Sequence, residues 1–229
     1  MKNILEEKPS KKLHGRLLAS VNFVDDYDLK NKDILDIGCG HGWCEMNFLD
    51  RGVKKMAAIE ISENDLQTIR NNIKDERLRL KIGKSSRLPF PNNSFDTIVS
   101  WDVIEHIPKN TELHMFREAS RVLKLGGCFY LSTPHKSFFT NILDPAWWLI
   151  GHRHYSLENL SEFAKDSEFQ ILEIKIGGRW WSLVSIIDLY ISKWVFRRNT
   201  LFSDFLDKKE DEEFSSNGFA HIYMKLRKI

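Results

Sequence analysis

The sequence predicts an α/β domain built on a mostly parallel β-sheet with helices on both faces. Short apolar segments that resemble buried strands alternate with amphipathic segments that resemble helices. One apolar segment, Ile34-Leu-Asp-Ile37, runs directly into glycines at positions 38, 40 and 42. Another, residues 55–60, ends in the carboxylate of Glu60. Glycines and an acid at the ends of neighbouring strands favour a ligand site at the carboxyl edge of the sheet.

The predicted elements follow the order that parallel strands with crossover helices require. We place strands near residues 33–37, 55–60, 78–83, 95–100 and 127–132, and helices near residues 11–24, 42–51, 63–74, 111–123 and 156–166. Ser156 is the expected cap of the last helix. Residues 171–176 and 220–227 have the alternation of a sixth and a seventh strand. The pattern is that of a Rossmann-like sheet.

Composition and charge limit the classes of partner. The chain of 229 residues, with 42% hydrophobic residues, is long enough for one domain with a substantial core, and we expect a single domain over residues 1–229. A formal net charge of +2 without a long basic run gives no reason to expect a nucleic-acid partner. The three cysteines show no metal-ligand spacing, and residues 1–12 lack the apolar core of a signal peptide. We expect reduced thiols, no metal and a cytoplasmic location.

The glycine run narrows the class of ligand. Glycine allows a tight turn and a close approach of another molecule to the backbone. The dinucleotide pattern G-x-G-x-x-G requires a third glycine where this chain has Trp43, and the chain contains no phosphate-binding P-loop pattern. An acid 22 residues after Gly38 also suits NAD, so Glu60 alone does not identify the ligand.

Later motifs identify the pattern. The segments Leu88-Pro-Phe-Pro-Asn-Asn-Ser-Phe-Asp96, Thr97-Ile-Val-Ser-Trp-Asp-Val-Ile-Glu-His-Ile-Pro108 and Arg121-Val-Leu-Lys-Leu-Gly-Gly-Cys-Phe-Tyr-Leu-Ser-Thr-Pro134 follow the glycine run in order. Together these motifs resemble the class I S-adenosylmethionine (SAM) dependent methyltransferases, in particular the methyltransferase type 11 group. Residues 33–134 are also similar to ubiquinone-biosynthesis O-methyltransferases. The resemblance implies a seven-stranded sheet whose last strand is antiparallel.

The resemblance also implies residue roles. Gly38 and Gly40 would line the methionine and ribose of SAM, and Glu60 would accept the ribose hydroxyls. Asp36 would fix the glycine loop through backbone hydrogen bonds or reach the amino group of the cofactor through water. The backbone of Trp101 would contact the methionyl part. The full set of expected cofactor contacts is Asp36, Gly38, Cys39, Gly40, Glu60, Ile61, Ser85, Ser86, Trp101 and His106.

Two positions leave alternatives open. The family often has an aspartate that binds the adenine amino group where this chain has Lys84, so Ser85 or a backbone carbonyl would have to replace that contact. Arg16 is either a partner of the SAM carboxylate or a solvated helix residue.

If the acceptor is a hydroxyl, a base must take its proton, and histidine is the usual group near neutral pH. His106 and His154 are the candidates, although His106 also suits a structural or cofactor-side role and His154 a loop anchor.

Two segments outside the motifs are expected on the acceptor side, as insertions or a lid. Residues 136–155 are aromatic, and residues 177–218 include a long apolar stretch. On a helix, Ser182, Ser185 and Ser192 fall along a narrow stripe and leave a wide apolar face. Asp188 and Lys193 argue against a transmembrane span. A lid or a homodimer contact is the preferred interpretation of residues 180–198, with peripheral membrane contact as the alternative, and the acidic residues 207–213 are expected in a solvated loop.

These observations predict a SAM-dependent methyltransferase that acts on oxygen, nitrogen or carbon of a small or lipid-like acceptor, with a saccharide or another polar metabolite left open as the alternative acceptor. Transfer would be an in-line displacement at the sulfonium methyl, with histidine as a base where the acceptor requires one. The alternative is a non-catalytic SAM-binding regulatory or scaffold protein.

Overall fold

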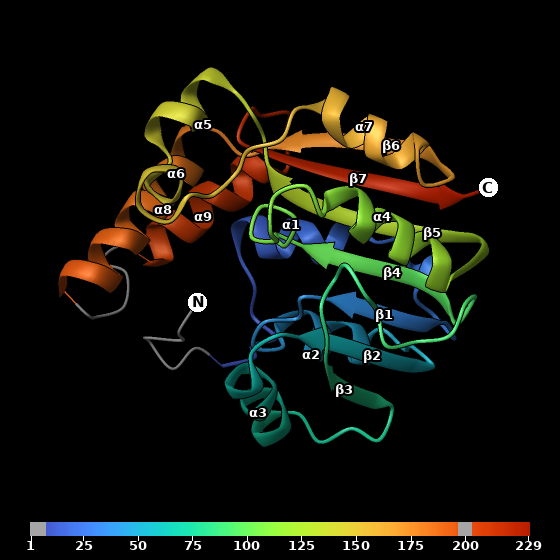
Figure 1. Cartoon of the computed structure of the whole chain (residues 1–229). Coiled ribbons are helices and arrows are strands. Elements are labelled where there is room, and N and C mark those ends of the chain that lie inside the picture. The colour runs from blue at the N-terminus through green and yellow to red at the C-terminus, as the bar shows by residue number, and fades with distance from the viewer. Residues whose placement is uncertain (1–7, 197–202) are drawn as a thin grey trace.

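The computed structural model describes residues 8–196 and 203–229, and its centre is a seven-stranded sheet (Figure 1). The strands are β1 (Asp33–Ile37), β2 (Lys55–Glu60), β3 (Leu78–Ile82), β4 (Phe95–Trp101), β5 (Leu123–Pro134), β6 (Phe169–Gly177) and β7 (His221–Lys228). Their order across the sheet is β3-β2-β1-β4-β5-β7-β6. Only the pairings of β7, with β5 and with β6, are antiparallel. The predicted Rossmann-like sheet with an antiparallel last strand is therefore confirmed.

Strand order places the site. The chain passes from β1 outward to β2 and β3, then returns to the other side of β1 to form β4. The crossover helices on the two sides of this reversal leave a crevice at the carboxyl ends of β1 and β4. The glycine run follows β1, and Trp101 ends β4. Both sequence motifs therefore meet at the switch point of the sheet.

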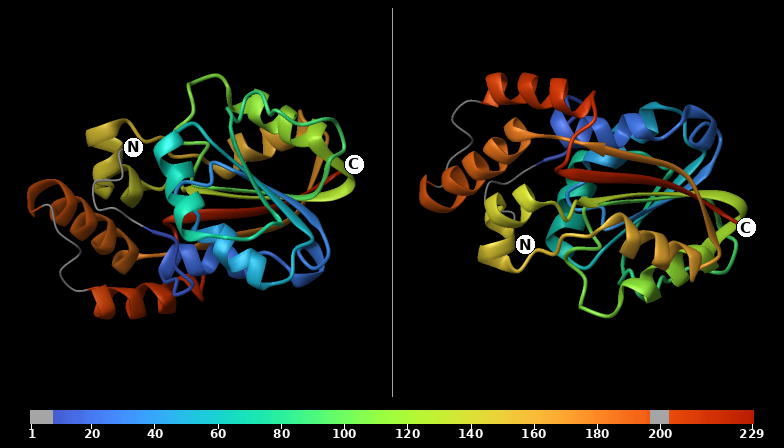
Figure 2. Two further views of the ribbon diagram at one scale, coloured as in Figure 1. Left: turned by 90° about the horizontal axis from the view of Figure 1, so that it is seen from below. Right: turned by 90° about the horizontal axis from the view of Figure 1, so that it is seen from above.

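Helices cover both faces of the sheet (Figure 2). The first layer contains α1 (Gly15–Phe23), α2 (Trp43–Asp50) and α3 (Glu63–Asn72), and the second contains α4 (Glu112–Val122) and α7 (Leu157–Lys165). The alternate side chains of β1 show how the layers form: Ile34 packs in the core under α1 and α2, whereas Leu35 packs in the core under α4 and α7. Ser156 accepts a hydrogen bond from the backbone N–H of Asn159, as expected of the cap of α7.

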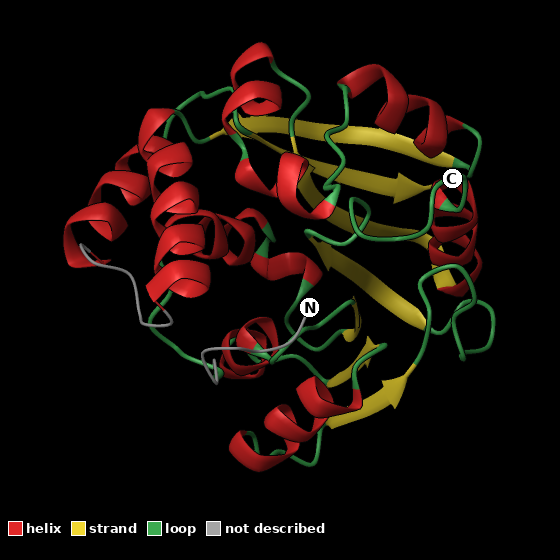
Figure 3. Ribbon diagram, turned by 60° about the vertical axis from the view of Figure 1, so that its left-hand side comes forward, coloured by secondary structure: helices red, strands yellow, loops and turns green. Residues whose placement is uncertain are grey.

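A group of helices projects beyond the carboxyl edge of the sheet (Figure 3). It contains α5 (Phe138–Leu143), α6 (Pro145–Ile150), α8 (Trp180–Tyr190), the π-helical η2 (Ile191–Phe196) and α9 (Ser203–Phe214). These are the segments expected as acceptor-side insertions, apart from residues 197–202, which lie outside the described residues. No helix in the described ranges combines the length and the apolar character needed to cross a bilayer.

The expectation of a solvated loop at residues 207–213 is wrong, because this segment belongs to α9. Its carboxylates serve other helices. Asp211 accepts the backbone N–H of Gly15 at 2.6 Å, where α1 begins. Glu213 accepts the N–H groups of Trp181 and Ser182 at 2.9 and 3.0 Å, in the first turn of α8. A carboxylate at a helix N-terminus satisfies free N–H groups and interacts favourably with the helix dipole. The acidic run therefore fastens α1 and α8 to α9.

Candidate functional site

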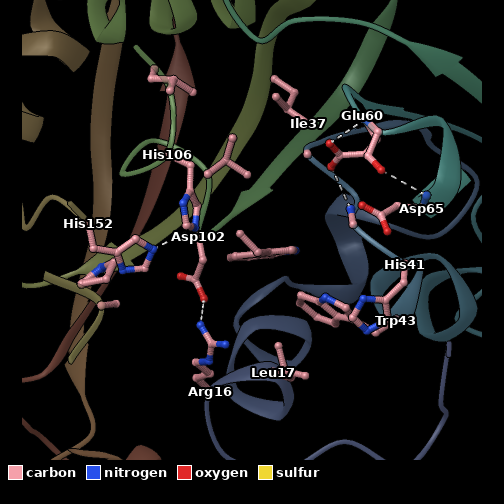
Figure 4. Close-up of a pocket in the computed structure, with 18 of the residues that line it drawn as sticks. Arg16, Leu17, Ile37, His41, Trp43, Glu60, Asp65, Asp102, His106 and His152 are labelled. Carbon is pink, nitrogen blue, oxygen red and sulfur yellow. Dashed lines mark hydrogen bonds and ion pairs between the residues drawn. The ribbon is translucent and has the colours of Figure 1, made fainter. Parts of the chain in front are cut away.

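One cavity of about 1490 Å³ lies along the carboxyl edge of the sheet. At one end it is lined by the glycine loop, Glu60 and the loop after β3, and at the other by α5, α6, α8 and the beginning of β7. Between the two ends lie Asp102 and His106, which follow β4 (Figure 4). Trp101, the last residue of β4, also lines the cavity. The cavity therefore connects the sequence motifs with the two insertions.

The glycine loop forms a bare wall of this cavity. Gly38 and Gly40 have φ angles of +80° and +53°, a region that favours glycine. A Cβ at Gly38 would lie 2.4 Å from Cγ2 of Val103, so the loop packs against the segment after β4 at that point. A Cβ at Gly40 would have no atom within 4 Å. The space beside Gly40 belongs to the cavity, where a ligand can lie directly against the backbone.

Glu60 links the loop to the end of β2. Its carboxylate accepts the backbone N–H of Gly40 at 3.2 Å and that of Ile61 at 2.7 Å. The N–H of Ser62 adds a third bond at 3.3 Å. A carboxylate can accept about four hydrogen bonds, so this one keeps capacity for a ligand hydroxyl. The same bonds hold Glu60 in place at the cavity wall (Figure 4).

Asp36 and Cys39 lie behind the loop and do not line the cavity. The loop N–H groups expected to bind Asp36 instead donate to other groups: those of Gly38 and Cys39 to the carbonyl of Ile59, at 2.9 and 3.1 Å. Burial raises the pKa of Asp36 to about 7, and it raises that of the neighbouring Glu45 well above its ordinary value. The expected side-chain role of Asp36 in the loop is therefore not met, because its carboxyl faces the interior.

The loop after β3 contributes the opposite wall. Ser85 and Ser86 line the cavity and are partly buried, and Lys84 beside them is exposed. Ile61 also lines the cavity and is 71% exposed. An apolar side chain and two polar groups around an open space can hold a flat heterocycle, with Ile61 against its face and the serines at its edge.

An ion pair stands at the centre of the cavity. Arg16 of α1 donates a hydrogen bond to Oδ2 of Asp102. Asp102 directly follows the buried Trp101 in the sequence. Burial alone would raise the pKa of Asp102, but its electrostatic interactions with His221 and Arg16 and its hydrogen bonds with His221 and Ser132 hold that pKa well below its ordinary value. Arg16 is thus neither simply solvated nor free of a partner. It lines the cavity with its charge paired.

His106 faces a second imidazole. Its Nε2 lies 2.9 Å from Nε2 of His152, and burial together with His152 lowers the pKa of His106 to about 4. Glu105, His106 and His152 bring potential ligand atoms within 4.8 Å of one another. The two imidazoles are hydrogen-bonded to each other, so we assign no metal to the group. His106 is therefore uncharged at neutral pH, and its Nε2 is already bonded to His152.

His154 does not line the cavity, and the structure gives it the role of a loop anchor. Its side chain is fully buried, with Nδ1 at 2.8 Å from Oδ1 of Asn141 and Nε2 at 2.8 Å from Oδ2 of Asp144. Both ring nitrogens are therefore occupied. This corrects the expectation that His154 is a base, because a base must reach the proton that it removes.

The motifs gave no indication of the far end of the cavity. His221 begins β7, Tyr190 ends α8, and Glu210 lies on α9, and all three line the cavity. Burial raises the pKa of Glu210 to about 8 in spite of Arg16. One signal was available for His221: the first residue of an antiparallel strand lies at the same edge as the last residues of its parallel neighbours.

Residues 34–127 match the profile of a family described as Methyltransferase domain. A probable SAM-dependent methyltransferase of Mycolicibacterium smegmatis is 26% identical over 140 residues, which cover 61% of this chain and 52% of that protein. The ubiquinone biosynthesis O-methyltransferase of Neisseria meningitidis is 27% identical over 133 residues, covering 56% of this chain and 55% of that protein.

Residues 34–127 thus match a methyltransferase domain, and the chain is similar to SAM-dependent methyltransferases.

Solved structures of this class share the whole fold. The geranyl diphosphate C-methyltransferase of Streptomyces coelicolor, solved with Mg²⁺, geranyl diphosphate and S-adenosylhomocysteine, has a TM-score of 0.67 at 14% identity. The alignment covers 93% of this chain and 77% of that one. The chain spans about half the length of the curated relatives that it matches. In this chain the profile covers the glycine loop, Glu60 and His106, whereas α5, α6, α8 and β7 lie beyond it.

Proposed function

We propose that this protein binds SAM at the glycine-loop end of the cavity and transfers its methyl group to a small, largely apolar acceptor bound at the α8 end. The observation that carries the proposal is the single cavity that connects these two ends. SAM supplies a methyl group activated by a sulfonium, so the protein has to align the acceptor and exclude water.

The cofactor contacts follow from the walls. Gly40 offers bare backbone, Glu60 accepts the ribose hydroxyls, and Ile61 covers one face of the adenine. Ser85 and Ser86 take the position at the adenine edge, since the exposed Lys84 cannot accept a hydrogen bond from the adenine amino group. These contacts hold the nucleoside half of the cofactor.

The methionyl half points toward β4. Gly38, Trp101 and His106 flank it, and Arg16 at the centre of the cavity is the cation that we assign to its carboxylate. Asp36 and Cys39 act from behind the loop by packing, without side-chain contact with the cofactor. This arrangement directs the methyl group toward the far end of the cavity.

The acceptor half has apolar walls. Leu183, Ile186 and Leu189 of α8 and Ala146 of α6 line it, together with the ring of Tyr190. Pockets of this kind take ligands with a large apolar body and few polar groups. We therefore propose a lipid-like or aromatic acceptor that carries one nucleophilic atom.

Label transfer tests the function. Purified protein is incubated with SAM carrying an isotopically labelled methyl group and an extract separated into apolar and polar fractions, and products are identified by mass spectrometry. We expect labelled products in the apolar fraction and their loss in Glu60→Ala. A protein that binds SAM yet labels nothing is the non-catalytic alternative, and labelled products only in the polar fraction contradict the apolar acceptor.

The outer face of the insertions favours a lipid surface as the source of that acceptor. On α8 and η2 the polar side chains of Ser182 and Ser192 are buried, whereas Val195 and Phe196 are 68% and 54% exposed. On α6, Trp148 and Leu149 are 69% and 67% exposed. Together with the exposed Phe138, Phe139, Ile142 and Leu143 of α5 they form what we call the lid face. An exposed apolar patch beside a ligand cavity is typical of a membrane or protein contact.

The charges near this face suit a membrane whose surface is anionic. Lys136 and Arg179 flank the lid face and are exposed. Arg197 and Arg198 follow η2 in the sequence but lie outside the described residues. Basic and tryptophan side chains beside an apolar face are typical of helices that lie at a bilayer surface. The free, buried Cys39, Cys44 and Cys128 support the expectation of a reducing, cytoplasmic environment.

Vesicle sedimentation tests this contact. We expect the protein to pellet with phosphatidylcholine vesicles that contain phosphatidylglycerol, and the double variant Trp148→Ser/Leu149→Ser to stay in the supernatant. Tyr27→Ser is the matched control, because Tyr27 of η1 (Asp26–Asp28) is 81% exposed and lies outside the lid face. Equal sedimentation of all three proteins contradicts the membrane contact. Self-association that the double variant abolishes, without vesicle binding, assigns the lid face to a homodimer.

A further inference from the structure

The topology of the sheet brings His221 to the carboxyl edge, along which the cavity lies. Strand β7 runs antiparallel to β5 and β6, so its first residue lies beside their last ones. His221 is in register with Pro134 on one side and with Gly177 on the other. It lines the cavity at the end walled by α8. Its imidazole thus occupies the acceptor half of the proposed site.

A carboxylate fixes the orientation of this imidazole. Nε2 of His221 lies 2.6 Å from Oδ1 of Asp102, and Oγ of Ser132 donates to the same oxygen at 2.9 Å. The other oxygen of Asp102 is bonded to Arg16. Asp102 itself has a φ angle of +56°, a region in which residues other than glycine are uncommon. A strained backbone that is held by three side-chain bonds is a common feature of functional sites.

The bond to Asp102 determines which nitrogen remains available. An ionised carboxylate only accepts hydrogen bonds, so Nε2 carries the hydrogen and Nδ1 keeps its lone pair in the neutral ring. Among residues 8–196 and 203–229, no group forms a hydrogen bond with Nδ1 of His221. This pairing of an imidazole with a buried carboxylate is the arrangement that activates nucleophiles in hydrolases.

The groups around the imidazole leave Asp102 as the anion that it faces, and such an anion stabilises the imidazolium that forms when the ring accepts a proton. Arg16 of α1 is paired with Asp102, and Tyr223 of β7 has a pKa well above its ordinary value because it is buried. Glu210 of α9 faces Arg16 and, with its pKa raised to about 8 by burial, is uncharged at neutral pH. Glu105 is likewise held protonated by burial and by the charge of Asp102. Asp102 is therefore the one anion next to the ring among the groups named here.

We propose that His221 is the general base that removes the proton of a hydroxyl acceptor, with Asp102 as its positioning residue. This inference rests on the proposed function and names the class of nucleophile for the same site, an alcohol or phenol. His106 is less suited to the task, because its Nε2 is bonded to His152.

The step balances without a further reactant. The acceptor O–H proton passes to Nδ1 of His221 as an oxygen electron pair forms the bond to the methyl carbon. The bond between that carbon and the sulfonium sulfur breaks, and its electron pair stays on sulfur as a neutral thioether. The positive charge thus moves from sulfur to the imidazole, where Asp102 stabilises it. The proton then leaves to solvent with the products.

Nitrogen NMR of the histidine rings tests the protonation state without an acceptor. In protein saturated with S-adenosylhomocysteine at pH 7, we expect His221 to carry hydrogen on Nε2 only, and its signals to be identified by their absence in His221→Asn. A ring protonated on both nitrogens up to pH 8 overturns the assignment, since it has no lone pair to offer.

Kinetics test the role with two probes of similar shape and different acidity, a para-alkylphenol and the corresponding thiophenol. At pH 7 the phenol must lose its proton to the enzyme, whereas the thiophenol is largely ionised in solution. We expect His221→Asn to lower kcat for the phenol by about 10²–10⁴-fold and to change kcat for the thiophenol by less than about fivefold. His114→Asn, at an exposed position on α4, is the matched control.

The outcomes separate the base from the site as a whole. Unchanged kcat for the phenol in His221→Asn overturns the base, and equal losses for both probes assign His221 a structural role. Asp102→Asn is expected to lower kcat and to move the acidic limb of its pH profile downward, a shift that a packing defect would not produce. A wild-type protein that binds no SAM, or that methylates neither probe, refutes the proposed function and the base with it.

Discussion

Substitutions of Gly38 and Gly40 in the glycine loop should separate effects on stability from effects on cofactor binding. Gly38 and Gly40 both have positive φ angles, so alanine at either site costs about 1 kcal/mol of folding free energy. At Gly40 nothing else opposes the methyl group, because no atom lies within 4 Å of it. At Gly38 the methyl group would lie 2.4 Å from Val103, which adds an overpacking cost of about 1–3 kcal/mol.

The expected changes in Tm follow from these free-energy costs. For a domain of this size, 1 kcal/mol corresponds to a change in Tm of roughly 2–4 °C. Gly40→Ala should therefore lower Tm by about that amount, and Gly38→Ala by at least about twice as much. Calorimetry with SAM should show the reverse order: Gly40→Ala loses about tenfold or more in affinity, about 1.4 kcal/mol, because its methyl group occupies the space of the ligand.

A second substitution makes the comparison specific. Val103→Ala removes the two methyl groups that the Cβ at position 38 would meet, so the double variant Gly38→Ala/Val103→Ala should recover much of the lost stability. Adding Val103→Ala to Gly40→Ala should not restore SAM binding. If Gly40→Ala binds SAM like the wild type, the glycine loop is not the cofactor wall, and the reasoning from the bare backbone is refuted.

Further predictions concern three buried or partly buried side chains. Glu60→Gln should weaken SAM binding by about 1.5–3 kcal/mol in calorimetry, whereas Glu63→Gln, whose carboxylate pairs with Arg70 at the surface, should not; equal effects would argue against a ribose contact. Because burial raises the folded-state pKa of Glu45, its contribution to stability is lost as pH rises, so Glu45→Gln should raise Tm at pH 8 and much less at pH 5. A gain of the same size at both values would contradict this. His154→Ala should cost about 1.5–3 kcal/mol in denaturant unfolding by removing a hydrogen bond to the buried Asp144, which keeps the N–H of Ala146 and the ring of His152 as partners, with kcat of the folded enzyme retained; a stable variant with reduced kcat would restore His154 as a base.

The central part of the fold could be predicted closely from local patterns. Strands β1 and β2 have the predicted bounds, because each is a short apolar segment between polar ends. Strand β5 extends beyond its prediction at both ends, from Leu123 to Pro134, because pairing with β4 and β7 continues past its apolar centre. That extension depends on neighbouring strands, which periodicity along one segment does not describe.

The roles of charged residues depend on partners that the local sequence does not show. The composition of the acidic run predicts a solvated loop, yet Asp211 and Glu213 bind helix N-termini that are distant in the sequence. Asp36 illustrates the opposite case: its position suggested loop hydrogen bonds, but the carbonyl of Ile59 already accepts them. In both cases the role of a polar group depends on which hydrogen-bond partner it meets in the folded protein.

The histidines show where sequence reasoning about the site reached its limit. His106 lies in a methyltransferase motif and His154 lies directly before the helix capped by Ser156, and of these two histidines only His106 lines the cavity. His221 is separated from Asp102 by more than half of the chain, and antiparallel pairing brings the two together. Motif spacing favours residues near the glycine loop, whereas the acceptor side is assembled from late elements.

The structure of the complex with S-adenosylhomocysteine tests the two-ended cavity most directly. We predict that the ribose hydroxyls lie within hydrogen-bond distance of Glu60, with the homocysteine carboxylate near Arg16. The sulfur should then face the acceptor half, toward His221, with open space between them for a hydroxyl-bearing acceptor. A ligand bound elsewhere, or one whose sulfur faces away from α8 and β7, would contradict the assignment of the two halves.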